Sequence, residues 1–144
     1  MISRMFRGDF LFAITLLFLS AIVAALPRSQ TDHRQLIARG KYLVERVAMC
    51  GDCHTPMNHK GEPVANRWLR GSVIGFKPIH PIPDWADKAP DIAGLPKGWG
   101  PAEMERFLET GLNPKGHHAD PPMPAYRLSV GDARSVTAYL LSLK

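Results

Sequence analysis

The sequence contains only two cysteines, and both lie within one five-residue stretch. A zinc site is disfavoured, because His59 and the pair His117-His118 could supply ligands but no second cysteine pair exists. A nucleic-acid interface is not expected either, since no dense run of lysine and arginine carries interleaved aromatic side chains. With 144 residues, no internal repeat and no low-complexity tract, the chain favours a single small domain.

Prolines, by contrast, are abundant and unevenly placed. Ten of the 13 prolines lie between Pro78 and Pro124, and proline removes a backbone donor and breaks helices. That stretch is therefore expected to be mostly loop, which leaves few residues for helices and only a modest apolar core. A large buried cofactor would add much to the stability of such a domain.

The start of the chain has the composition of an export leader. Residues 10–26 are 17 consecutive uncharged residues without proline, and two arginines precede them. This order directs a chain to the export machinery and leaves its basic end in the cytoplasm. Val23-Ala24-Ala25 could serve as a cleavage site, whereas the length of the run favours a retained anchor. We predict residues 1–27 to be a signal peptide or a single membrane-anchor helix, and residues 28–144 to be a domain outside the cytoplasm.

The charge of that domain is mildly basic. The whole sequence has a formal charge of +5, and residues 27–144 contain 16 basic and 12 acidic side chains, or +4. A charge of this size suits a docking patch for a protein partner better than a nucleic-acid footprint.

The first helix of the domain is predicted to start at Thr31 or Asp32, either of which can cap it. Its apolar residues recur near the helical period until about Met49. Residues 50–100 show no strand pattern longer than a few residues and are expected to be irregular.

Two further helices are indicated by their ends. Gly100 and Pro101 begin the second, because proline at the first helical position lacks only a donor that would be unpaired anyway, and Gly111 ends it. Ser129, with Asp132 three residues later, begins the third. The predicted fold is therefore all-α, with three or more short helices joined by long loops.

The two cysteines belong to Cys50-Gly51-Asp52-Cys53-His54, a C-x-x-C-H motif that is the attachment signature of c-type haem. Two thiols at this spacing reach the two vinyl groups on one edge of a porphyrin and form thioethers. The histidine that follows lies beneath the iron as its proximal ligand. Because c-type attachment occurs outside the cytoplasm, the predicted export strengthens this interpretation. The sequence predicts one covalently bound haem c.

Two other uses of the cysteine pair fit less well. A thioredoxin-like redox pair needs a strand-to-helix setting that the surrounding sequence lacks. A disulfide between Cys50 and Cys53 would close too small a loop to stabilise the fold much. A haem site is therefore the preferred interpretation.

The sixth ligand of the iron is predicted to be Met123. A histidine–methionine pair is typical of electron-carrying cytochromes, and the thioether raises the reduction potential. Met123 lies in Pro121-Pro122-Met123-Pro124, where the flanking prolines fix the backbone and hold a weak ligand at little ordering cost.

Other residues compete for this role. Met104 fits ordinary core packing on a helix, and Met49 and Met57 are too close to the attachment motif. His117 and His118 are the rival ligands, since either could complete a bis-histidine site.

These features resemble the class I cytochrome c family, in which C-x-x-C-H follows the first helix and a methionine loop precedes the last. More narrowly, the sequence is similar to the electron-accepting cytochrome domains of membrane-bound bacterial alcohol and aldehyde dehydrogenases. Those subunits usually carry three haem domains in series, whereas this chain has one attachment motif. The resemblance covers about residues 36–144 and rests on Arg39-Gly40-Lys41-Tyr42-Leu43-Val44, Cys53-His54-Thr55-Pro56, Ala89-Pro90-Asp91-Ile92, Gly98-Trp99, Glu109-Thr110-Gly111, Met123-Pro124-Ala125-Tyr126-Arg127-Leu128 and Ala138-Tyr139-Leu140-Leu141-Ser142-Leu143.

The resemblance implies a class I cytochrome c fold wrapped around one haem. It implies that His54 and Met123 ligate the iron and that Cys50 and Cys53 form the thioethers. It also implies that a proline carbonyl holds the other ring nitrogen of His54, and Pro63 is the candidate.

The same resemblance suggests several packing roles. Trp68, Arg70 and Trp99 are candidates for contacts with the haem propionates. Gly40 is expected to let the first helix pack closely on Tyr139-Leu140 of the last helix.

The function that the resemblance implies is one-electron transfer, without a small-molecule substrate, between redox proteins of a respiratory or dehydrogenase chain. Such a carrier needs an exposed haem edge and a small, transient docking surface. Its expected partners are redox proteins, including a membrane-bound dehydrogenase or oxidase complex, on the outer face of the inner membrane or in the periplasm. The alternatives are a haem-based enzyme or a ligand-binding sensor with a labile sixth ligand.

Overall fold

The structure is a computed structural model, and it describes residues 28–143. The predicted leader at residues 1–27 lies outside the described residues. The chain divides into residues 1–32 and residues 33–144, and every described element beyond the first turns of α2 belongs to the second unit. Within residues 28–143, no helix has both the length and the apolar character needed to cross a membrane.

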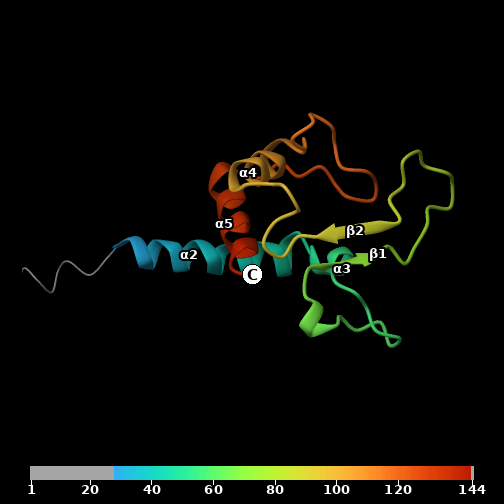
Figure 1. The fold of residues 1–144 in the computed structure, drawn as a ribbon, viewed down its shortest axis with the longest axis horizontal. Coiled ribbons are helices and arrows are strands. Elements are labelled where there is room, and N and C mark those ends of the chain that lie inside the picture. Colours follow the sequence, from blue (N-terminus) through green and yellow to red (C-terminus); the bar gives the residue numbers. More distant parts are fainter. Residues whose placement is uncertain (1–27, 144) are drawn as a thin grey trace, which may run out of the picture. The chain divides into compact units, whose positions relative to one another are not determined.

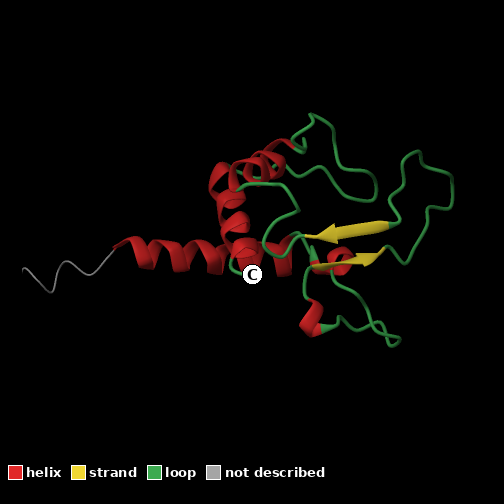
Figure 2. Ribbon diagram, in the orientation of Figure 1, coloured by secondary structure: helices red, strands yellow, loops and turns green. Residues whose placement is uncertain are grey.

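Helices make up most of the regular structure in residues 28–143 (Figures 1 and 2). Two short strands, β1 and β2, form an antiparallel pair in which Arg70 faces Asp91 and Val73 faces Lys88. The elements in chain order are α2 (Arg28–Tyr42), the π-helical turn η1 (Leu43–Val47), α3 (Gly51–His54), the 3-10 turn η2 (Ala65–Arg67), β1 (Arg70–Val73), β2 (Lys88–Asp91), α4 (Pro101–Thr110) and α5 (Val130–Leu141).

The first helix differs from its prediction at the start. Thr31 and Asp32 lie inside α2 and do not cap it, because the backbone is already helical at Arg28. The helical path continues through η1 to Val47 and ends where Met49 adopts a left-handed backbone with φ 50°, close to the predicted end.

Both predicted ends of the second helix and the predicted start of the third are confirmed. Gly100 precedes α4, and its backbone N–H donates to Oε2 of Glu103 over 3.0 Å. Gly111 ends the helix with φ 75°, a left-handed conformation that favours glycine. Ser129 caps α5, with its Oγ accepting a hydrogen bond from the Asp132 backbone N–H over 3.2 Å.

The core lies where η1, α4 and α5 meet and extends to the loop after β2. α4 contributes Met104, Phe107 and Leu108, and α5 contributes Val136 and Leu140. Each helix thus buries the apolar face that its sequence period predicts. Around this core, residues 74–87 and 112–128 form the long proline-rich loops that Figure 2 shows in green.

Gly40 lies where α2 meets α5, as expected. A Cβ atom at this position would lie 1.9 Å from the backbone oxygen of Ser135 and 2.8 Å from Cβ of Tyr139. Only glycine leaves room for this close approach of the two helices.

Candidate cofactor site

A cavity of about 430 Å³ opens beside α3. It brings together all four residues of the predicted haem site: Cys50, Cys53, His54 and Met123. Most of the remaining lining is apolar and comes from β2, the loop between β2 and α4, α4, α5 and the proline-rich loops, including Pro90, Ile92, Pro96, Trp99, Met104, Phe107, Leu108, Tyr126, Val136 and Leu140. An apolar cavity with a few convergent polar groups is typical of a cofactor site.

The cysteine thiols are both free and half-buried. Cys50 immediately precedes α3, and Cys53 lies within it, and residues three apart on a helical turn face the same side. Burial raises the pKa of the Cys50 thiol to about 11, which keeps it neutral at physiological pH. Both thiols therefore line the same cavity.

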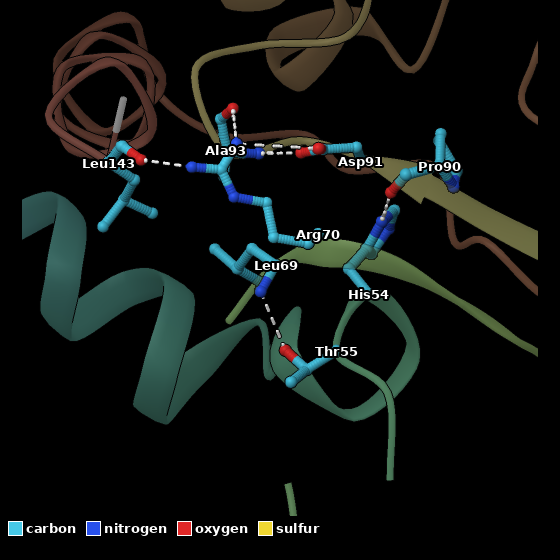
Figure 3. Close-up of polar contacts among 8 residues, drawn as sticks. All are labelled: His54, Thr55, Leu69, Arg70, Pro90, Asp91, Ala93 and Leu143. Carbon is cyan, nitrogen blue, oxygen red and sulfur yellow. Dashed lines mark hydrogen bonds and ion pairs between the residues drawn. The ribbon is translucent and has the colours of Figure 1, made fainter. Parts of the chain in front are cut away.

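The His54 ring is 6% exposed, and its Nδ1 lies 2.8 Å from the backbone oxygen of Pro90 (Figure 3). A carbonyl oxygen only accepts hydrogen bonds, so Nδ1 donates and Nε2 carries the lone pair. Burial lowers the pKa of His54, which favours the neutral ring. His54 is thus held in the tautomer that can bind a metal through Nε2.

The partner of His54 differs from the residue that the resemblance suggested. Pro63, which the resemblance suggests, pairs with Met57 in an isolated β-bridge, and His54 Nδ1 instead donates to the backbone oxygen of Pro90 in β2. The pairing of β1 with β2 brings Pro90 to the histidine, although 36 residues separate them.

Hydrogen bonds connect the start of β1 to the residue after the attachment motif and to Leu143. Oγ1 of the buried Thr55 accepts the Leu69 backbone N–H over 3.0 Å. Arg70 donates from Nη2 to the Leu143 backbone oxygen over 3.0 Å (Figure 3). Rigid support of this kind orients a ligand histidine.

Of the three residues suggested for propionate contacts, only Trp99 lines the cavity. Trp68 donates from Nε1 to the Tyr139 hydroxyl over 3.1 Å, and Arg70 is engaged with the Leu143 backbone oxygen. Both side chains thus have protein partners, and their contact with the propionates stays a prediction.

The methionine loop places Met123 in the cavity and His117 and His118 outside its lining. His118 is held by a 2.9 Å hydrogen bond between its Nδ1 and the Gly111 backbone oxygen. Met49 and Met104 also line the cavity. Met104 is 5% exposed and packs in the core.

One feature of the cavity wall was not anticipated from the sequence. Tyr126 lines the cavity and donates from its hydroxyl to the Ala48 backbone oxygen over 3.0 Å. Burial raises the pKa of Tyr126 to about 12, so the hydroxyl stays protonated. Three residues after Met123, this tyrosine connects the methionine loop to the attachment segment, and no local sequence signal reveals the connection.

The family model described as "Cytochrome c" matches residues 37–144. This chain therefore belongs to the cytochrome c family. Membership implies covalently bound haem c with its iron, and Cys50, Cys53 and His54 fit the attachment motif. The site agrees with that group, because two free thiols, a neutral histidine and an apolar wall converge on one cavity.

Several curated proteins are similar to this chain. A diheme cytochrome c-type protein of Cereibacter sphaeroides is 33% identical over 107 residues, which are 71% of this chain and 33% of the relative. The fructose dehydrogenase cytochrome subunit of Gluconobacter japonicus is 31% identical over 114 residues, 73% of this chain and 21% of that subunit. The gluconate 2-dehydrogenase cytochrome c subunit of Pantoea cypripedii is 32% identical over 105 residues, which are 67% of this chain and 22% of that subunit. The chain thus spans a third or less of the length of these relatives.

Proposed function

We propose that this protein carries single electrons through one haem c, joined to Cys50 and Cys53 by thioethers and ligated by His54 and Met123. The observation that carries the proposal is that all four side chains line one apolar cavity. Family membership and the similarity to dehydrogenase cytochrome subunits support electron transfer. When bound, haem c supplies the one-electron couple of its iron.

The protein's own groups tune that couple. The hydrogen bond from His54 Nδ1 to Pro90 fixes the ring and increases the basicity of Nε2. The thioether of Met123 favours the reduced state and so raises the reduction potential. The apolar wall excludes water, which further disfavours the more highly charged oxidised state.

Electron exchange is expected at the edge that carries Cys53. This residue lines the cavity and also an adjacent open groove of about 890 Å³. Met57, Val73 and Phe76 line the same groove and are 42%, 67% and 53% exposed. Exposed apolar side chains next to a redox centre suit a transient protein contact.

The partners follow from the same comparisons. Two relatives are named as cytochrome subunits of fructose and gluconate dehydrogenases, so the proposed partner is a dehydrogenase or another redox protein. The basic, apolar start of the sequence supports a location outside the cytoplasm, either anchored to the membrane or released. In this proposal residues 28–144 act as a monohaem class I cytochrome c domain.

The proposal is tested by following haem through denaturation of the purified holoprotein. Haem should remain with the chain after denaturation and extraction, and the double change Cys50→Ala with Cys53→Ala should abolish that retention. Met57→Ala, beside the motif but outside the cavity lining, is the matched control and should retain haem. Covalent haem in the double variant would refute the attachment.

A visible spectrum in both oxidation states separates an electron carrier from the alternatives. Six-coordinate, low-spin iron in both states is expected if His54 and Met123 are the ligands. High-spin iron in either state would indicate an open site and point instead to a haem-based enzyme or sensor.

A further inference from the structure

The segment that carries Met123, residues 119–126, is tied to the rest of the protein at few points. Within residues 28–143, the one hydrogen bond of Met123 stays inside the segment, from its backbone N–H to the Asp120 backbone oxygen over 3.2 Å. Within the same residues, two hydrogen bonds join this segment to other parts of the protein. They are Ala86 N–H to the Pro121 oxygen, 2.7 Å, and the Tyr126 hydroxyl to the Ala48 oxygen, 3.0 Å. A further hydrogen bond joins the segment to the adjoining Arg127.

These two anchors lie on either side of Met123. Pro121 is two residues before it and Tyr126 three residues after it. The first anchor uses a backbone carbonyl, whereas the second depends on a single side-chain hydroxyl. If the second is lost, the next hydrogen bond after Met123 to another element of the described part of the chain is the one from Arg127 to the Thr110 oxygen.

The acceptor of the Tyr126 bond belongs to a fixed part of the fold. The Ala48 backbone N–H donates to the Leu43 oxygen over 2.7 Å, and the Cys50 backbone N–H donates to the Val44 oxygen over 3.0 Å. Leu43 and Val44 are buried in the core. The hydroxyl therefore links the methionine segment to the rigid turn that leads directly into the attachment motif.

We propose that Tyr126 is a positioning residue whose hydroxyl holds residues 119–126, and with them Met123, closed over the cofactor cavity. The inference rests on the proposed function, since it concerns the retention of the Met123 ligand. The ring of Tyr126 fills part of the cavity wall, so packing and hydrogen bonding can be separated by removing the hydroxyl alone.

The size of the expected effect follows from the strength of one hydrogen bond. If opening of the segment breaks this bond, its loss increases the open population by about 2- to 12-fold, the ratio that corresponds to an ordinary net hydrogen bond. An external ligand that binds only the open form then binds more tightly by the same factor. Imidazole is a suitable ligand, because it competes with a thioether for iron.

The experiment titrates oxidised holoprotein with imidazole and follows loss of the methionine-to-iron charge-transfer band. Tyr126→Phe should bind imidazole about 2- to 12-fold more tightly than the unmodified protein. Tyr42→Phe is the matched control: its ring is 52% exposed and lies under the Arg39 guanidinium, 5.6 Å from its centroid. No hydrogen bond within residues 28–143 uses the Tyr42 hydroxyl, so the control should not change the affinity.

A second variant and a melting curve keep the test decisive. Replacing Tyr126 with 4-aminophenylalanine restores a donor at the para position and should return the affinity toward that of the unmodified protein. An unchanged imidazole affinity in Tyr126→Phe would overturn the inference, even if the thermal midpoint fell, because the hydroxyl would then serve stability alone. Absence of the band in the unmodified protein would instead refute the Met123 ligand in the proposed function.

Discussion

Replacing Gly40 with alanine tests the close contact between helices α2 and α5. The added methyl group would lie 1.9 Å from the Ser135 backbone oxygen, 2.6 Å from its carbonyl carbon and 2.8 Å from Cβ of Tyr139. The two nearest atoms belong to the backbone of α5, so no change of side-chain rotamer can relieve the overlap. The helices must move apart at this point.

The magnitude can be worked from two opposing effects. Overpacking of a well-packed contact costs about 1–3 kcal/mol, and a clash with backbone places Gly40→Ala near about 3 kcal/mol. Alanine in a helix interior recovers about 0.5–1 kcal/mol relative to glycine. The net loss is about 2 kcal/mol, which for a domain of this size lowers the thermal midpoint by about 8 °C.

The assay is thermal unfolding of the holoprotein followed by circular dichroism. Gly131→Ala is the matched control, because it makes the same change in the facing helix α5, where a Cβ atom meets nothing within 4 Å. The control should keep or slightly raise the midpoint. If Gly40→Ala melts no lower than Gly131→Ala, the close approach of α2 and α5 is wrong.

Three further predictions concern single contacts. Ser129→Ala removes the cap of α5 and should cost about 1 kcal/mol in chemical unfolding, so an unchanged midpoint would contradict the cap. Thr55→Val leaves the Leu69 backbone N–H without its acceptor and should lower the free energy of unfolding by about 1–3 kcal/mol. A Thr55→Val variant with an unchanged free energy of unfolding would show that this hydrogen bond is dispensable. Arg39 donates to Asp132 over 3.0 Å and lowers the pKa of that carboxyl in the folded protein. The ion pair therefore stabilises the fold fully above the ordinary aspartate pKa of about 3.9. This stabilisation is lost as the pH falls through the lower pKa that Asp132 has in the folded protein. In Arg39→Met the thermal midpoint should therefore fall less between pH 6 and pH 3 than in the unmodified protein, and equal slopes would contradict the pairing.

Local signals in the sequence were sufficient to predict the helix ends and the attachment motif, because each depends on a few neighbouring residues. Gly100, Pro101 and Gly111 set the ends of α4, and Ser129 sets the start of α5, because capping and left-handed backbone depend on one or two neighbouring residues. The C-x-x-C-H motif is equally local. These features required no knowledge of how the chain packs.

Features that depend on distant pairing could not be predicted in this way. The resemblance points to Pro63 as the partner of His54, whereas the strand pair places Pro90 there. β1 and β2 are four residues long, and β2 contains a proline, so neither carries an alternating pattern. The bond between Tyr126 and Ala48 spans 78 residues and likewise has no sequence signature.

Met123 is proposed to be the second protein ligand of the iron, beside His54, in an electron carrier. The most direct measurement is the methionine-to-iron charge-transfer band of oxidised holoprotein in the unmodified chain, in Met123→Ala and in Met104→Ala. Both methionines line the cavity, so the comparison separates ligation from packing. We predict that the unmodified protein shows the band, that Met123→Ala loses it and has a lower reduction potential, and that Met104→Ala keeps it while losing about 2–5 kcal/mol of stability. A band that survives in Met123→Ala and disappears in Met104→Ala would contradict the assignment, and a low-spin spectrum without the band in all three proteins would transfer the role to a histidine, with His117 and His118 the first to test.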